Sequence, residues 1–452
     1  MTSTIANLQH ATRTLKDGAV VLVLNTGALI NPEAEAMLQA LHSRSTGGIR
    51  AHLEVLIEKG AEHFMGTFYV GYGHKSIGDC GDVTVFVEGV SMLVAKAIQD
   101  WRLYAGQESS TRYVDFGAQA FKNPVGTPEG EALQERWRAF YLTGLPVMRD
   151  SLTVRYPKAP EEKEGVYQKA IAARAFDTMR AFLPAGATTN LAWHMNLRQF
   201  ADELTLLRHH PLVEVREVAL AVEDALLEAF PSSFTSKRYE ATEAYSTSLM
   251  RSHYYDDLSA EPFVMTRNDI DRVQLEEYRE ALISRPPKTE LPRHIAECGT
   301  MQFRFLLDFG SWRDIQRQRS VVQRMPLLTT RHGFHPWYLG ELPEALRTQA
   351  EDLITLQETS LTTLATTPEV AQYYLPMGYM TANRLTGDLH ALTYIVELRT
   401  TRFVHPTLRE RAQQMATVLL REFGPSGLTL HLDAEPDRFD VRRGEHDIVR
   451  MT

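Results

Sequence analysis

The stretch that decides the fold is LPAGATTNLAWHMNLR, residues 183–198, because a second stretch, LPMGYMTANRLTGDLH at residues 375–390, aligns with it without a gap. Both are followed by the same landmarks in the same order: a Leu-Arg pair, a His-Pro pair and an Arg-Glu pair. Such internal similarity is the sequence signature of repeated architecture. The chain is therefore predicted to contain two copies of one domain.

The two cysteines of the chain support this prediction. Cys80 and Cys298 lie in matching contexts, Asp-Cys-Gly and Glu-Cys-Gly, each followed by a strand-like apolar run and a helical segment with arginines. The first copy is longer between its cysteine and its Leu-Pro pair, so we expect a solvated insertion there, at residues 118–163, rich in proline, glycine and charge. The expected domains are residues 1–250 for the first copy, 251–292 for a linker and 293–452 for the second copy.

Apolar residues at three- and four-residue spacing predict a mostly helical chain. Short apolar runs predict strands at residues 20–24, 83–87 and 303–307. The predicted class is α/β of the α+β kind, helix-rich, with a small sheet packed with helices in each copy. The helical patterns cover residues 33–60, 90–101, 165–182, 213–230, 343–366 and 406–423.

Composition and charge exclude several classes of protein. With 452 residues, 44% of them hydrophobic and 23% charged, the chain has the proportions of a globular protein. Its formal charge of -9 repels polyanions, so no nucleic-acid partner is expected. No segment approaches the roughly 20 apolar residues that a membrane span requires. The two cysteines are too few for a disulfide framework, so we expect a cytoplasmic protein without a membrane partner.

The densest group of recognition side chains is QESSTRY at residues 107–113. It brings a carboxylate, two neighbouring hydroxyls and a guanidinium to one helix-to-loop transition. Arginine binds phosphate oxygens bidentately, serine donates or accepts, and glutamate accepts ring N–H groups, so a nucleotide would satisfy all three. A solvated helix end with a salt bridge would explain the same residues.

Other charged groups leave two explanations open. Arg317, Arg319 and Arg324 cluster near the end of a predicted helix, where they could bind an anion or complement the helix dipole. Arg198 and Arg208 could form a second anion clamp or be surface arginines. His332 and His335 have a spacing that could hold a metal, but glycine and proline around them indicate a loop, and no metal site is predicted.

Taken in order, these motifs resemble those of the flavin-dependent thymidylate synthases. The resemblance covers roughly residues 60–230 and, more faintly, 290–425; it identifies the chain as a tandem-duplicated, divergent member. It implies an enzyme that uses FAD, NADPH and methylenetetrahydrofolate to convert dUMP to dTMP. The family forms homotetramers, so a duplicated chain is expected to form a homodimer. The motifs are GHKS at 73–76, Asp79-Cys80, FVEGVS at 86–91, QESSTRY at 107–113, the Leu-Pro block at 183–198 and EVRE at 214–217.

The resemblance also implies roles for individual residues. Arg112 would anchor the phosphate of the nucleotide, and Ser110 and Glu108 would position its base. Arg198 would polarise the uracil carbonyl, so Arg198 and Ser110 are the implied catalytic residues, and Arg208 would be a further substrate contact. The implied cofactor-binding residues are His74, Ser76, Arg102, Gln107, Asn196, Arg317 and Arg319.

The chain departs from the family pattern in a complementary way in its two halves. The family's Arg-His-Arg start, which serves the flavin, is Asp100-Trp101-Arg102 in the first copy, and the upstream flavin-side histidine is Cys80. The second copy keeps both arginines of that start, as Arg317 and Arg319, but lacks the nucleotide residues, which become Met325, Leu327 and Thr329. One hypothesis assigns nucleotide contacts to the first copy and flavin phosphate contacts to the second. Its rivals are a second copy kept as a scaffold and a non-redox pyrimidine-nucleotide-binding homologue that has lost the flavin site.

Overall fold

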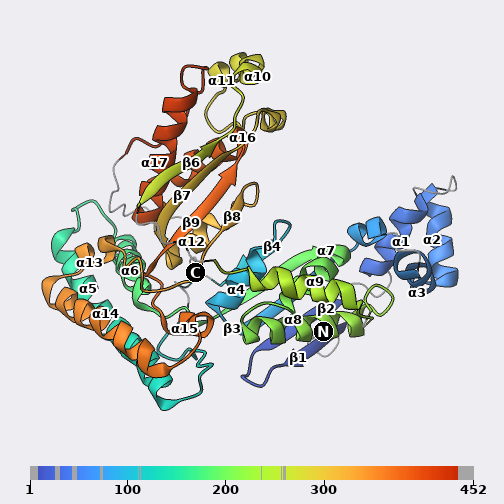
Figure 1. Cartoon of the computed structure of the whole chain (residues 1–452), viewed down its shortest axis with the longest axis horizontal. Helices are drawn as coiled ribbons and strands as arrows, with labels where there is room; N and C mark the ends of the chain where they lie inside the picture. The colour runs from blue at the N-terminus through green and yellow to red at the C-terminus, as the bar shows by residue number, and fades with distance from the viewer. Residues whose placement is uncertain are drawn as a thin grey trace. The chain divides into compact units, whose positions relative to one another are not determined.

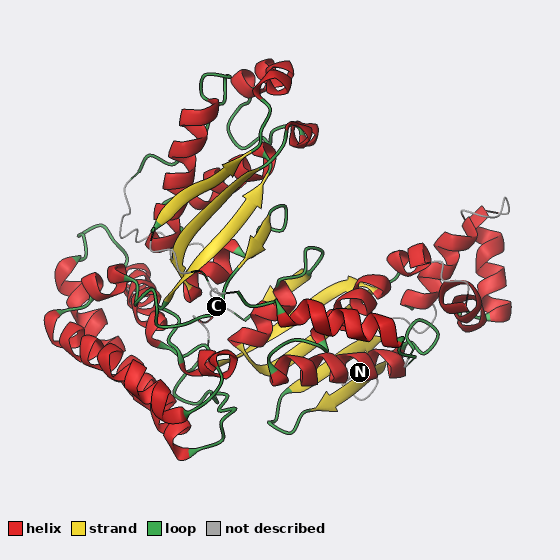
Figure 2. Cartoon of the chain, viewed as in Figure 1, coloured by secondary structure: helices red, strands yellow, loops and turns green. Residues whose placement is uncertain are grey.

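The computed structural model describes residues 9–25, 31–42, 48–71, 75–109, 111, 114–235, 237–255, 257 and 261–435. The chain forms two compact units (Figure 1). Unit 1 comprises residues 1–110 and 188–254, and unit 2 comprises residues 111–187 and 255–452. Each unit contains one antiparallel sheet with helices around it, shown in yellow and red in Figure 2. The predicted helix-rich α+β class is therefore confirmed.

The sheet of unit 1 has five strands in the order β1-β2-β3-β5-β4. Along β3, Val83, Val85 and Val87 are buried and alternate with more exposed residues, as a half-buried strand requires. Trp193 of β5 lies opposite Val85 and is also buried. Helices α4, α7 and α8 pack on the sheet. The strands are β1 (Gln9–Thr14), β2 (Val20–Asn25), β3 (Asp82–Ser91), β4 (Ala105–Glu108) and β5 (Thr188–Asn196).

The helices of unit 1 follow the sequence pattern closely where apolar spacing is regular. The helix expected over 213–230 is α8, and the helix expected over 90–101 is the shorter α4, because β3 continues to Ser91. The pattern over 33–60 is divided between α1 and α2, with residues 43–47 outside the described part. The bounds are α1 (Pro32–His42), α2 (Gly48–Lys59), α3 (Glu62–Phe64), η2 (Met65–Gly71), η3 (Lys75–Cys80), α4 (Met92–Gln99), α7 (Leu197–Leu207), α8 (Val213–Ala229) and α9 (Glu240–Arg251).

The sheet of unit 2 has four strands in the order β6-β7-β9-β8. The central strand β7 is buried on both faces: Phe303 and Phe305 are fully covered, and Arg304 between them is almost so. Strand β6 lies within the expected linker 251–292 and pairs with β7 over five residues, so this segment is part of the folded unit. The strands are β6 (Phe263–Asn268), β7 (Met301–Asp308), β8 (Val322–Arg324) and β9 (Met380–Gly387).

Segment 118–163 is folded, which differs from the solvated insertion expected there. It contains the whole of helix α5 (Pro128–Arg155), which buries Leu133, Trp137 and Met148. The indole Nε1 of Trp137 donates to Oε1 of Gln357 on α14 at 2.7 Å. Apolar residues at helical spacing therefore outweigh the proline, glycine and charge in this segment, and it packs within unit 2.

The other helices of unit 2 surround α5 and the sheet. Helices α6 and α14 pack against α5, and α17 packs on β7. The patterns at 343–366 and 406–423 are confirmed as α14 and α17. Among the described residues, no helix has the length and apolarity to span a bilayer. The bounds are α6 (Glu164–Met179), η5 (Arg180–Phe182), α10 (Arg272–Leu275), η6 (Glu276–Tyr278), α11 (Arg279–Ser284), η7 (Arg293–Cys298), α12 (Phe309–Ile315), α13 (Pro336–Glu341), α14 (Glu344–Leu364), α15 (Pro368–Ala371), η8 (Gln372–Tyr374), α16 (Leu389–Arg399) and α17 (Pro406–Phe423).

The two units share a local plan in which a strand runs directly into a capped helix. In unit 1, Ser91 caps α4 and Asn196 caps α7, each accepting a hydrogen bond from a backbone N–H of the first turn. In unit 2, Asp308 caps α12 and Asp388 caps α16 in the same way. The short helices η3 and η7 both end at a cysteine. This correspondence supports the proposed duplication.

Candidate functional site

The recognition motif begins on β4, an edge strand that pairs with β5. Gln107 is exposed, and the carboxylate Oε2 of Glu108 accepts a hydrogen bond from Nε2 of Gln99 at 2.8 Å. This bond ties the motif to the last turn of α4. Three predicted site residues, His74, Ser110 and Arg112, lie outside the described part of the chain.

Asp100 and Trp101, at the start of the family motif, both make contacts within unit 1. Asp100 forms an ion pair with Lys96 at 2.5 Å, and the indole Nε1 of Trp101 donates to Oε1 of Gln199 at 2.9 Å. Arg102 is exposed. A carboxylate and an indole thus stand where the family has two cationic or titratable groups.

A second acidic group lies near Asp100 in the interior of unit 1. Glu203 on α7 is 2% exposed, and neither of its carboxylate oxygens has a hydrogen-bond partner among the described residues. Burial raises the pKa of Glu203 well above its usual value, and the negative charge of Asp100 raises it further. The nearby indole of Trp193 only partly offsets this rise. The environment of Glu203 therefore favours its neutral form over its charged form.

The predicted residues at the start of α7 are also engaged. The side chain of Asn196 accepts the backbone N–H of Gln199 at 2.9 Å, which caps the helix. The Nε of Arg198 donates to Oδ1 of Asp79 at 2.6 Å, joining α7 to η3. Ser76, also on η3, is exposed. Arg198 can polarise a substrate carbonyl only with the Nη atoms that Asp79 leaves free.

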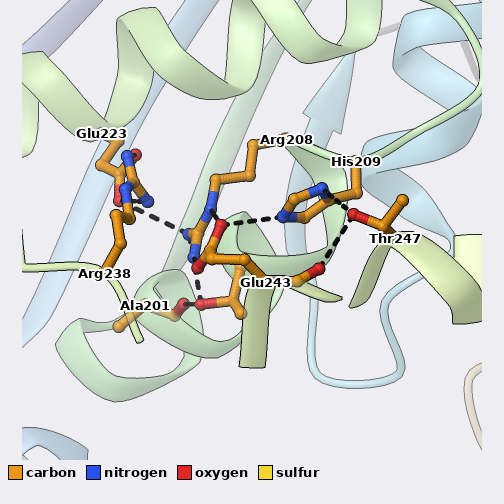
Figure 3. A network of polar contacts seen from close by, with 8 residues as sticks. Ala201, Arg208, His209, Glu223, Arg238, Glu243 and Thr247 are labelled. Atoms are coloured by element: carbon orange, nitrogen blue, oxygen red, sulfur yellow. Dashed lines mark hydrogen bonds and ion pairs between the residues drawn. The ribbon is translucent and has the colours of Figure 1, made fainter. Parts of the chain in front are cut away.

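Arg208, at the other end of α7, is held in a network of charged side chains (Figure 3). Its guanidinium binds both carboxylate oxygens of Glu243, with Nε donating to Oε2 at 2.9 Å, and lies 3.5 Å from Glu223. His209 contacts the same carboxylate through Nε2 at 2.9 Å. These contacts, the bonds from Arg208 above all, lower the pKa of Glu243 to about 2.

Arg198 and Arg208 do not form one anion clamp. They lie at opposite ends of α7, and ten residues of α-helix span about 15 Å. The Arg208 side chain is only 9% exposed and faces two carboxylates. In this structure Arg208 fastens α9 to α7.

Arg317 and Arg319 lie in unit 2, just after α12, and both are exposed. No hydrogen bond or ion pair joins either side chain to another described residue. A diphosphate group needs several cationic donors, so these residues fit the phosphates of FAD. The described residues of unit 1 do not, because Asp100 and Trp101 replace the cationic donors and Asn196 is a helix cap. Among the described residues, no group of three His, Cys, Asp or Glu side chains could hold a metal ion.

Residues 30–232 match the family described as thymidylate synthase complementing protein. The chain is also similar over most of its length to proteins described as UPF0159 proteins. The relative from Chlamydia pneumoniae is 26% identical over 411 residues, covering 78% of this chain and 76% of the relative.

Two further relatives have the same description. The protein from Chlamydia muridarum is 27% identical over 438 residues, covering 82% of this chain and 81% of the relative. The protein from Thermoplasma acidophilum is 24% identical over 430 residues, covering 79% of this chain and 86% of the relative. These matches extend beyond residue 232, so the relatives also resemble the chain in its second half.

The sequence did not point to Glu203 or Glu243. A signal existed for Glu203, since it lies on the apolar stripe of α7 between Phe200 and Leu204, where a carboxyl group must be buried. No local pattern marked Glu243, because its partner Arg208 lies 35 residues earlier.

Proposed function

We propose that this protein is a thymidylate synthase-type enzyme that transfers a one-carbon unit to C5 of a uracil nucleotide, with dUMP as the first substrate to test. The observation that carries the proposal is the family match over residues 30–232, which contains the intact Glu-x-Ser-x-Arg motif. In this proposal the acting form is a homodimer.

The residues of unit 1 would bind and orient the nucleotide. Glu108, held by Gln99 at 2.8 Å, accepts an N–H of the uracil ring. Ser110 and Arg112 contact the base and the phosphate. Arg198, oriented by Asp79, donates from its Nη atoms to a uracil carbonyl, which withdraws electrons from the ring as C5 reacts.

The cofactor would be FAD, with NADPH and methylenetetrahydrofolate as co-substrates. Bound flavin would supply the hydride and the relay of the one-carbon unit. The exposed Arg317 and Arg319 would bind its phosphates.

A second candidate function is non-redox binding of a pyrimidine nucleotide. The ion pair of Asp100 with Lys96 and the bond of Trp101 to Gln199 favour it, because they fill the flavin positions of unit 1 with internal contacts.

The deciding experiment combines an absorption spectrum with a nucleotide titration. The first function predicts that added FAD acquires the spectrum of bound flavin, bleaches with NADPH, and supports dTMP formation from dUMP and methylenetetrahydrofolate. The second predicts dUMP binding without flavin. Failure to bind dUMP at all would contradict both.

The variant Arg112→Ala tests the nucleotide site directly. Loss of a charge-assisted contact to phosphate should weaken dUMP binding by about tenfold or more. Arg267→Ala, which removes an exposed arginine of unit 2 paired with Asp269, is the matched control and should leave the affinity unchanged. Equal affinities of the two variants would rule out the Arg112 contact.

A further inference from the structure

Two consecutive histidines that follow α7 contact two different parts of the α9 region. His209 contacts Glu243 and Thr247 on α9, and His210 contacts His253, just after the end of α9. All of these residues belong to unit 1. Only two residues of α9 are buried, so polar contacts of this kind decide its position.

The hydrogen bonds of His209 require its charged form (Figure 3). Hydrogen bonds from Arg208 above all, and from His209, lower the pKa of Glu243 to about 2, so this carboxylate is ionised and only accepts. Nε2 of His209 lies 2.9 Å from Oε2 of Glu243. Nδ1 lies 2.9 Å from Oγ1 of Thr247, whose hydroxyl donates to the backbone oxygen of Glu243. Both ring nitrogens thus face acceptors, and both bonds form together only when both nitrogens carry a proton.

The hydrogen bonds of His210 require the opposite, neutral form. His210 is 1% exposed, and its Nδ1 accepts the backbone N–H of Leu212 at 3.1 Å. The one proton of the ring is therefore on Nε2, which donates to Nε2 of His253 at 3.2 Å. The ring of Tyr254 packs edge-to-face against both histidines. The contact exists only while Nε2 of His253 carries no proton.

The charges around His210 also oppose its protonation. Besides His253, it faces the cations Lys96 on α4 and Arg216 on α8. Burial first, and then these three like charges, lower the pKa of His210 well below its usual value of 6.5. The neighbouring His209 differs, because the cation beside it, Arg208, shares the carboxylate of Glu243 with it.

We propose that His209 and His210 form a two-sided pH latch for α9, which is docked when His209 is charged and the pair of His210 and His253 is neutral. In acid, a proton on Nε2 of His253 places two N–H groups against each other, and this contact opens. In alkali, His209 loses a proton and with it one of its two bonds to α9. The latch is independent of the proposed function.

On the acid side, the docked state binds fewer protons than the released state, because it keeps His210 neutral. A histidine in the released state titrates near the usual value of 6.5. Docking is therefore fully favoured above pH 6.5 and weakens as pH falls below it. The equilibrium constant for opening of α9 should rise by up to about tenfold per pH unit in that range.

Hydrogen exchange of the full-length protein measures this opening. The exchange rate of the α9 amides is followed from pH 5 to pH 9 and divided by that of an unstructured peptide of the same sequence, which removes the effect of pH on the exchange chemistry. We expect the opening constant to be lowest near neutral pH. It should rise by about tenfold towards pH 5 and by about fivefold towards pH 9, where one hydrogen bond is lost.

Two variants each remove one side of the latch. His253→Gln keeps an acceptor for Nε2 of His210 that does not titrate, so the rise towards pH 5 should be lost and the rise towards pH 9 kept. His209→Gln removes the charged group on the other side, so the rise towards pH 9 should be lost, with faster exchange at neutral pH. The control is His63→Gln, an exposed histidine of α3, which should keep the wild-type profile.

Slow exchange of the β3 amides in each variant shows that the sheet is folded. Absence of either rise in the wild type would overturn the two-sided latch. So would an acid rise that persists in His253→Gln or an alkaline rise that persists in His209→Gln. These readouts need neither nucleotide nor flavin, so failure of the proposed function leaves them unchanged.

Discussion

Glu203 is a carboxyl group in the core of unit 1, with Asp100 and Trp193 as its polar neighbours. Water solvates a carboxylate far better than this environment does, so the proton stays on Glu203 at pH values where an exposed glutamate has lost it. A neutral group here has a direct consequence for stability, because the unfolded chain releases that proton and the folded chain keeps it.

We predict that Glu203 makes the free energy of unfolding of the wild type decrease as pH rises. The folded pKa lies above the usual value of 4.5, so the stabilising contribution is complete below pH 4.5 and is lost as pH rises through the folded pKa. In that range the free energy of unfolding should fall by about 1.4 kcal/mol per pH unit relative to Glu203→Gln. Urea denaturation between pH 5 and 8 measures it.

The control for this experiment is Glu240→Gln, an exposed glutamate of α9. The free energy of unfolding of this variant should depend on pH in the same way as that of the wild type. Parallel pH profiles of the wild type and Glu203→Gln would show that Glu203 is ionised in the fold.

At the same scale, the identity of candidate residues was readable from the sequence but their pairing was not. Arg198 binds Asp79, which lies 119 positions away, and Arg208 binds Glu243. A sequence motif shows which chemical groups are present. Whether the donor atoms of those groups can bind a substrate depends on the ion pairs that they form in the folded chain. For this reason Arg208 was predicted as a substrate contact and is found fastening a helix.

Among the elements, α9 depends on a few polar contacts for its position. Only Ser246 and Met250 of this helix are buried. Glu243 supplies its main attachment, through Arg208 and His209, and Thr247 adds a hydrogen bond with His209 Nδ1 at 2.9 Å (Figure 3). An element with so little buried apolar surface is expected to open locally before the sheet does.

We predict that Glu243→Gln loosens α9. Removing the carboxylate leaves Arg208 partly buried without its main partner, which should cost about 1 to 3 kcal/mol. Hydrogen exchange of the α9 amides should accelerate more than that of β3. The pKa of Glu243 is lowered to about 2, so the wild type should lose the same contribution as pH falls from 4.5 towards 2. Unchanged exchange in α9 would contradict the role of Glu243.

The elements that the sequence predicted are those whose own residues specify them. Helices α8, α14 and α17 have regular apolar spacing, and β2, β3 and β7 contain apolar runs. The other described strands, β1, β4, β5, β6, β8 and β9, were not predicted. Of these, β4 and β8 have only four and three residues, and β9 mixes polar and small side chains. Such strands form because a neighbouring strand pairs with them, and this pairing is not visible in the sequence of the strand itself.

On the scale of the whole molecule, we predict a homodimer. If two fused domains replace two chains of a family tetramer, closed twofold symmetry gives two copies of this chain. Light scattering coupled to size exclusion should give about twice the chain mass of 51.2 kDa, independent of loading concentration. A mass of one chain at all concentrations would contradict the homodimer.

The bond between Trp137 and Gln357 has a consequence for synthesis on the ribosome. The two residues are 220 positions apart, and the chain completes unit 1 with residues 188–254 before it returns to unit 2. At about 5 to 20 residues per second, the apolar side of α5 waits on the order of 10 to 40 seconds for its partner helix α14. During that interval the indole of Trp137 lacks Gln357, the acceptor of its N–H, so the packing of α5 is completed only after α14 has been synthesised.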